Sequence, residues 1–85
     1  MTTTTITLEH PITVDGVEVT ELTLRRPKVR DVRAADKSGG SDGAREIRLF
    51  ANLCEQTPEA IEEMDMADYL KIQEAYQNFL SPKKT

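Results

Sequence analysis

Apolar and polar residues alternate in the N-terminal part of the chain, with a break at a proline. Ile6 and Leu8 form one alternating pair, and Ile12 and Val14 form a second pair beyond Pro11. A period of two residues is typical of a β-strand that buries one of its faces. Because proline has no N–H to donate to a neighbouring strand, the pattern predicts a strand that is interrupted near Pro11.

A tight turn and a return strand are predicted next. Asp15-Gly16 lies between two valines, and this dipeptide favours a type I′ hairpin turn, in which both central residues have positive φ. The alternation then changes phase between residues 17–19 and residues 22–24. Such a change moves side chains to the opposite face of a strand, so we expect a β-bulge near Thr20 or Glu21. A hairpin alone is marginally stable in water, and this one therefore needs helices to pack against.

A short basic helix and a glycine-rich loop are predicted after the hairpin. Pro27 is suited to the first turn of a helix, where its missing N–H leaves no hydrogen bond unmade. In that helix Val29, Val32 and Ala35 lie on one side, which leaves it little apolar surface to bury. The segment SGGSDG, residues 38–43, is expected to be a flexible loop.

A well-formed apolar stripe predicts a second helix in AREIRLFANLCEQ, residues 44–56. Ser41 or Asp42 is placed to cap the start of this helix with a side-chain oxygen. The apolar positions follow the i, i+3, i+4, i+7 spacing of one helix face and comprise Ile47, Phe50, Ala51 and Cys54, widened by Leu49 and Leu53. Thr57-Pro58 then predicts the N-cap and the first residue of a short helical turn.

Two carboxylates in the segment DMADY, Asp65 and Asp68, precede the last apolar run. Asp65 stands where an N-cap belongs, and Asp68 in the first turn lies at the positive end of the helix dipole. The apolar residues at helical spacing beyond them are Tyr69, Ile72, Tyr76, Phe79 and Leu80, and Ser81-Pro82 ends the run. No histidine lies nearby to complete a metal or catalytic site, so we interpret the pair as the start of a helix.

Other candidates for chemistry are few. His10, the only histidine, precedes a proline in a predicted strand and is expected on the surface, with no nucleophile beside it. Cys54, the only cysteine, lies on the apolar face of the second helix, where a buried thiol is typical. A single cysteine excludes an internal disulfide and a cysteine-rich zinc site. The glycine-rich loop lacks the lysine of a phosphate-binding loop. We therefore predict no enzymatic activity, no catalytic residue, no cofactor and no metal.

The 85 residues predict one small α+β domain, residues 1–85, in which an N-terminal β-hairpin is followed by three to four short α-helices. Residues 1–5 and 81–85 are expected to be flexible. A chain of this length buries a small core, so we expect it to form a homo-oligomer or to bind a partner. It has neither an apolar run of the roughly 20 residues that cross a bilayer nor a signal-peptide pattern. We expect a cytoplasmic location and no membrane partner.

Charge is unevenly distributed in a chain whose net charge is −4. Residues 25–33, RRPKVRDVR, hold five bases and one acid, whereas residues 55–68, EQTPEAIEEMDMAD, hold six acids and no base. The two runs are either two solvated faces or a dipolar surface that orients the protein on itself or on a partner. The negative balance argues against nucleic acid as a partner. A small DNA-binding regulator or antitoxin-like module, using segment 25–33 on phosphates, remains the alternative.

Several short sequence motifs follow one another between Ile6 and Leu80. They are Leu22-Thr23-Leu24-Arg25 with Pro27 and Asp31, Leu53 with Thr57-Pro58-Glu59, Met64-Asp65 with Ala67-Asp68-Tyr69, and Phe79-Leu80. In their order and spacing, the chain resembles the tail assembly chaperone family of Mu-like and related long-tailed phages.

The resemblance implies a non-enzymatic protein of virion morphogenesis in an infected or lysogenic bacterium. Such chaperones bind the tape measure protein, keep it soluble, help recruit tail tube subunits, and are absent from the mature virion. An amphipathic helix laid along a client helix can perform this role, and aromatic residues are enriched at such contacts. The candidate contact residues are therefore Tyr69, Tyr76, Phe79 and Leu80, together with Arg30. Alternatively, the three aromatic side chains pack on the second helix and the hairpin.

Overall fold

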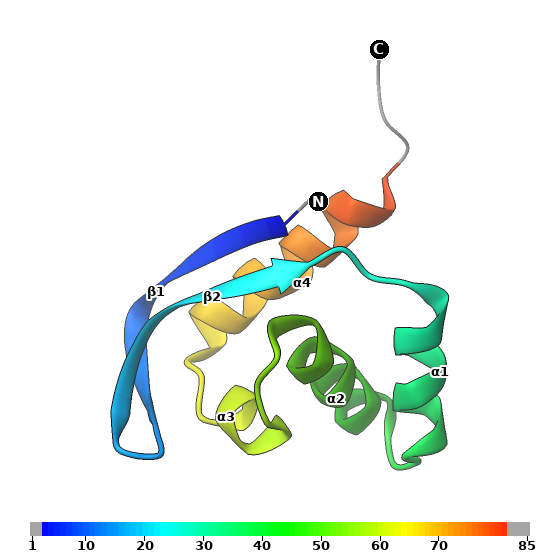
Figure 1. Cartoon of the computed structure of the whole chain (residues 1–85), viewed down its shortest axis with the longest axis horizontal. Helices are drawn as coiled ribbons and strands as arrows, with labels where there is room; N and C mark the ends of the chain where they lie inside the picture. The colour runs from blue at the N-terminus through cyan, green and yellow to red at the C-terminus, as the bar shows by residue number, and fades with distance from the viewer. Residues whose placement is uncertain (1–2, 82–85) are drawn as a thin grey trace.

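The computed structural model describes residues 3–81, which form two antiparallel strands followed by four helices (Figure 1). The elements are β1 (Thr3–Val14), β2 (Val17–Arg25), α1 (Val29–Lys37), α2 (Asp42–Cys54), α3 (Pro58–Glu62) and α4 (Met66–Leu80). β1 packs against α4 and β2 packs against α2, while α1 and α3 both contact α2. The predicted α+β class, with an N-terminal hairpin followed by short helices, is confirmed.

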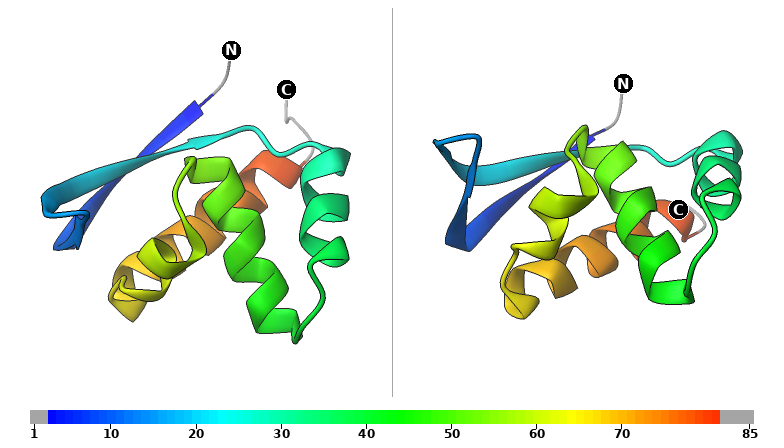
Figure 2. Two further views of the ribbon diagram at one scale, coloured as in Figure 1. Left: turned by 60° about the horizontal axis from the view of Figure 1, so that its bottom comes forward. Right: turned by 90° about the horizontal axis from the view of Figure 1, so that it is seen from below.

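The hairpin has the predicted turn. Asp15 and Gly16 have φ values of 51° and 79°, so both central residues have the positive φ of a type I′ turn. Figures 1 and 2 show that this end of the hairpin projects beyond the helices. The opposite end of the sheet reaches Thr3, which pairs with Arg25. Of the residues predicted to be flexible, three threonines, residues 3–5, belong to β1 and pair with β2. Residues 1–2 and 82–85 lie outside the described part of the chain.

The predicted bulge lies opposite Thr20, one of the two expected residues, but in β1 rather than in β2. Thr7 pairs with Glu21, and the next pair is Ile12 with Val19. Four residues of β1, 8–11, therefore stand opposite a single residue of β2. The prediction of a bulge in β2 was wrong because a change of phase between paired strands can be absorbed by extra residues in either of them. Here they gather beside the proline of β1, which has no N–H to donate to β2.

The core draws on both strands and all four helices. Its buried apolar side chains are Ile6, Leu8, Ile12, Leu22, Leu24, Ala35, Leu49, Phe50, Ala51, Leu53, Cys54, Ala60, Ile61, Met64, Ile72, Ala75 and Phe79. The stripe predicted for residues 44–56 is confirmed in α2, where only Ile47 is less than fully buried. α2 lies between α1 and α3 in all three views of the molecule and is the central helix of the core (Figures 1 and 2).

Three of the predicted helix caps are present. Ser41 accepts a hydrogen bond from the Ala44 N–H at 3.1 Å and caps α2. Thr57 accepts one from the Ala60 N–H at 3.2 Å, with Pro58 as the first residue of α3. Asp65 accepts one from the Ala67 N–H at 2.9 Å and caps α4. Each cap satisfies a backbone donor that the helix itself leaves without a partner.

The first helix differs from the prediction. α1 begins at Val29 rather than at Pro27, because the Asp31 carboxylate accepts the Lys28 N–H at 2.8 Å and so fixes Lys28 as the N-cap. Of the side expected to be apolar, only Ala35 is buried, and Val29 is 77% exposed. Asp31 also joins the helix to the end of β2, because its carboxylate accepts two hydrogen bonds from the Arg25 guanidinium, at 2.9 and 2.7 Å.

Asp68 does more than favour the helix dipole. Its side chain is fully buried and accepts hydrogen bonds from the backbone N–H groups of Glu9 and His10, both at 3.0 Å. These amides belong to the bulge of β1, where pairing with β2 is interrupted. The Lys71 ammonium lies 3.4 Å from the same carboxylate and donates to the Thr7 carbonyl at 3.1 Å. Asp68 and Lys71 thus fasten the bulge to the first turns of α4.

Replacing aspartate by asparagine is expected to have unequal effects at the two carboxylates. Asparagine caps helices as well as aspartate, so Asp65→Asn should leave the melting temperature within about 2 °C of the wild type. Asp68→Asn puts an NH₂ group against one of two backbone donors, so it should lower the melting temperature by about 5 °C or more. Thermal unfolding followed by circular dichroism measures both; equal shifts would contradict the role given to Asp68.

Stability is expected to fall in acid. The Arg25 guanidinium lowers the pKa of the Asp31 carboxyl; burial opposes this and the Lys28 N–H adds to it. Burial raises the pKa of Asp68, but the two backbone donors and Lys71 outweigh burial, so this pKa also lies below its usual value. The unfolded chain, with carboxyl pKa values of about 3.9, then binds more protons than the folded one as the pH falls below about 4.

The stabilisation from both carboxylates is therefore present above about pH 4 and is lost as the pH falls toward their folded-state pKa values. Urea unfolding at about pH 5 and pH 3 should show a smaller loss for Asp68→Asn than for the wild type, because the variant lacks one of the two groups. An equal loss in the two proteins would show that Asp68 does not contribute.

Candidate partner-binding surface

The structure does not bring the five sequence-predicted contact residues together on one surface. Tyr69, Tyr76, Phe79 and Leu80 lie on α4, whereas Arg30 lies on α1. Phe79 is only 8% exposed and belongs to the core, and the two tyrosines are half-buried. Leu80 is 54% exposed, and Arg30 is exposed. Two of the five side chains are therefore freely accessible.

The two tyrosines join α4 to α2. Their rings lie on either side of Phe50, with centroids 5.6 Å away for Tyr69 and 5.5 Å away for Tyr76, in tilted arrangements. The Tyr69 hydroxyl donates to a carboxylate oxygen of Glu46 at 2.5 Å, and the Gln73 amide donates to the same oxygen at 2.9 Å. Burial and the Glu46 carboxylate raise the pKa of the Tyr69 hydroxyl above its ordinary value. Both tyrosines thus serve the fold and keep part of their surface open.

The basic segment is partly engaged within the protein. Arg25 is bound to Asp31, and the Arg26 guanidinium lies 5.6 Å from the centroid of the Phe79 ring, a cation–π distance. The exposed bases that remain are Lys28, Arg30 and Arg33. They lie at α1, and the exposed acids Glu59, Glu62, Glu63 and Asp65 lie at α3 and just beyond it.

The two charged segments lie on opposite sides of the molecule. α1 and α3 both contact α2, which separates them in every view (Figures 1 and 2). Of the two interpretations of the charge runs, this arrangement favours a dipolar surface, because the basic and acidic segments lie on either side of α2.

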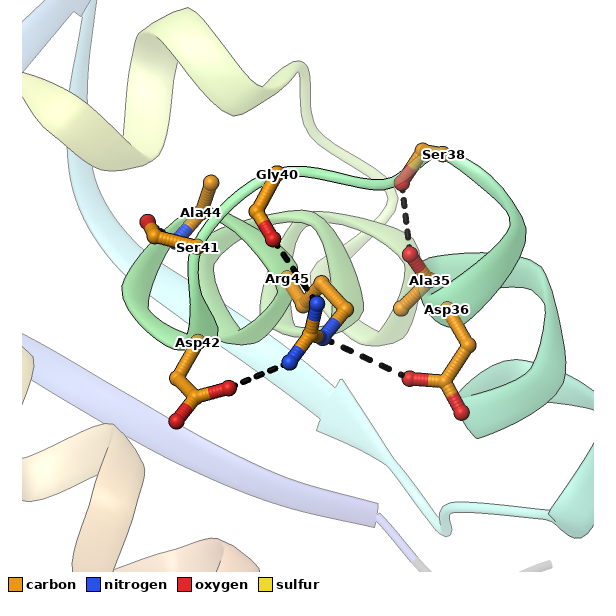
Figure 3. A network of polar contacts seen from close by, with 8 residues as sticks. All are labelled: Ala35, Asp36, Ser38, Gly40, Ser41, Asp42, Ala44 and Arg45. Atoms are coloured by element: carbon orange, nitrogen blue, oxygen red, sulfur yellow. Dashed lines mark hydrogen bonds and ion pairs between the residues drawn. The ribbon is translucent and has the colours of Figure 1, made fainter.

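Arg45 organises the loop between α1 and α2 (Figure 3). Its guanidinium donates to the Gly40 carbonyl at 2.7 Å, forms an ion pair with Asp42, and lies 3.6 Å from the Asp36 carboxylate. The Ser38 hydroxyl donates to the Ala35 carbonyl at 2.6 Å. The expected flexible segment 38–43 is therefore shorter than predicted, since α2 already begins at Asp42, and its remaining residues are tied to both helices.

The remaining candidates for chemistry are Cys54, His10 and any cluster of metal-binding side chains. Cys54 is buried, and burial raises the pKa of its thiol to about 12, which disfavours the thiolate. The His10 side chain is exposed. Across residues 3–81 no group of three or more His, Cys, Asp or Glu side chains is placed to hold a metal ion. In the same range, no helix is long and apolar enough to cross a membrane.

α4 has a second apolar face that the sequence reasoning missed. Met66 is 65% exposed, and Leu70 and Leu80 are each 54% exposed. With Gln73 and Gln77 they recur at spacings of four, three, four and three residues, and we call these five residues the outer stripe. The spacing was visible in the sequence, but the prediction assigned α4 only one apolar face, which included Leu80 and left out Met66 and Leu70.

Comparison with known proteins assigns the chain to a protein family. The family described as "Phage tail assembly chaperone proteins, E, or 41 or 14" matches residues 5–81. The chain therefore belongs to this family of phage tail assembly chaperones. No curated protein and no solved structure matches it. The predicted resemblance is confirmed, and the DNA-binding alternative gains no support from the comparisons.

Proposed function

We propose that this protein binds the tape measure protein of a long-tailed phage, keeps it soluble and helps recruit tail tube subunits during tail assembly. The family match over residues 5–81 is the observation that carries the proposal. The chaperone acts in the cytoplasm of an infected or lysogenic bacterium and is absent from the mature virion. It acts by binding and has no catalytic role.

The physical basis of the proposal is the exposed apolar surface of α4. A tape measure helix with apolar stripes aggregates unless those stripes are covered, and a short amphipathic helix laid alongside covers them. Leu80 offers an exposed apolar contact, and Tyr69 and Tyr76 are half-buried and so keep part of their surface accessible. Phe79 supports this helix from the core, and Arg30 on α1 supplies a polar contact at a distance from it.

Co-expression with the tape measure protein of the same phage is the direct test. The wild-type chaperone should shift the client from the insoluble to the soluble fraction and co-purify with it. Phe79→Ala is the matched control, because truncating a buried phenylalanine costs about 3–5 kcal/mol and is enough to unfold a small domain. This variant should lose the effect together with its circular dichroism signal. A client that is equally soluble without the chaperone, or insoluble with it, would contradict the proposal.

We further propose that the protein associates with itself through its opposed charges, with the bases of α1 meeting the acids around α3 of a neighbour. Light scattering in about 20 mM salt should give a mass above that of a monomer. About 0.5 M salt should lower this mass, since screening shortens the reach of exposed charges to a few ångströms. A stable monomer at high micromolar concentration in low salt would refute self-association.

A further inference from the structure

The outer stripe of α4 has the geometry of a coiled-coil seam. Its residues, Met66, Leu70, Gln73, Gln77 and Leu80, repeat every 3.5 residues on average, which is the spacing of positions a and d in a heptad. The buried residues of the same helix, Asp68, Ile72, Ala75 and Phe79, lie on its opposite side. α4 thus presents one face to its own core and a second face on which Met66, Leu70 and Leu80 are exposed, while Gln73 in the middle of the stripe donates to Glu46 of α2.

The seam starts beside an apolar hollow. A depression of about 180 Å³ is lined by Ile47, Ile61, Glu62, Met64, Met66 and Tyr69, from α2, α3, the α3–α4 connection and α4. A cavity of about 150 Å³ holds a benzene molecule, so this hollow has room for one apolar side chain of a partner. Methionine side chains adapt to varied shapes, and two of them line the hollow.

We infer that the outer stripe of α4 is the docking seam for an amphipathic helix of the tape measure protein, whose apolar residues recur at heptad spacing. One of those apolar side chains enters the hollow beside Met66. The inference rests on the proposed function and assigns the contact to the outward face of α4, opposite the face that carries Phe79.

Charge favours a foreign helix over a second copy of α4. A twofold, antiparallel pairing of two α4 helices centred on the stripe has its axis near Gln73. This brings Glu74 close to its own symmetry mate, and like charges at such flanking positions repel. Lys71 is the only base of α4, and it is engaged with Glu9 and Asp68 at 3.5 and 3.4 Å. The acids Glu62 and Glu74 beside the seam instead suit a client helix flanked by lysine or arginine.

A charge placed in the seam tests the inference. Leu70→Glu should reduce the tape measure protein that co-purifies with the chaperone by about tenfold or more, which corresponds to about 1.4 kcal/mol of binding. Val29→Glu on α1 is the matched control: Val29 is 77% exposed and Leu70 54% exposed, and the charge introduced is the same. This control should stay within about twofold of the wild type. Circular dichroism should show that both variants are folded.

The outcomes separate the inference from the proposed function. A wild type that captures no client overturns both. A wild type and a Leu70→Glu variant that capture the client equally overturn the inference and leave the function standing. If Leu70→Glu changes the mass of the purified chaperone alone, the seam is occupied by a second copy and the inference is wrong. Photo-crosslinks from position 70 to client residues spaced three and four apart support it.

Discussion

The buried carboxylate of Asp68 joins two parts of the chain that are almost sixty residues apart. Its two oxygens accept the N–H groups of Glu9 and His10, which lie in the unpaired bulge of β1. Buried backbone donors without a partner are strongly destabilising, so this contact settles where α4 lies beneath the hairpin. Once the inward face of α4 is fixed by Asp68 and Ile72, the outward position of Leu70 is fixed as well. The contact thus links the fold to the surface offered to a partner.

A second buried carboxylate has the same position in its helix but a different task. Asp31 and Asp68 are each the third residue of a helix, α1 and α4 respectively. Asp31 accepts from the nearby Lys28 N–H and from Arg25 at the end of β2, so it joins the helix start to the adjoining strand. Asp68 reaches the other strand instead. Together the two carboxylates fasten one helix to each strand of the hairpin.

The features that the sequence could predict are those formed by residues close together in the chain, namely the hairpin turn and the helix caps. The turn at Asp15-Gly16 and the caps at Ser41, Thr57 and Asp65 depend on residues within three positions of one another, and all four are present. The partners of Asp68 were beyond such reasoning, because an acid in the first turn of a helix looks the same whether it faces water or a distant bulge. The strand that carries the bulge was likewise undetermined, since either strand can absorb the extra residues.

The candidate contact residues were predicted mainly on α4, but the sequence did not show which face of that helix stays exposed. Periodicity placed Tyr69, Tyr76 and Phe79 together, and the structure shows that their stripe turns largely toward α2 and the core. A helix with apolar residues on two sides has one side left to cover, and in α4 that side is the outer stripe. The proposed function assigns this free face to the binding of a client helix.

Hydrogen–deuterium exchange of the chaperone, alone and bound to its tape measure client, is the most direct test of client binding at the outer stripe of α4. Client binding should slow exchange chiefly in α4, residues 66–80, and in the adjoining α3, while α1 and the turn of the hairpin exchange as before. Slowing confined to the hairpin or to α1, with α4 unchanged, would contradict binding at this stripe.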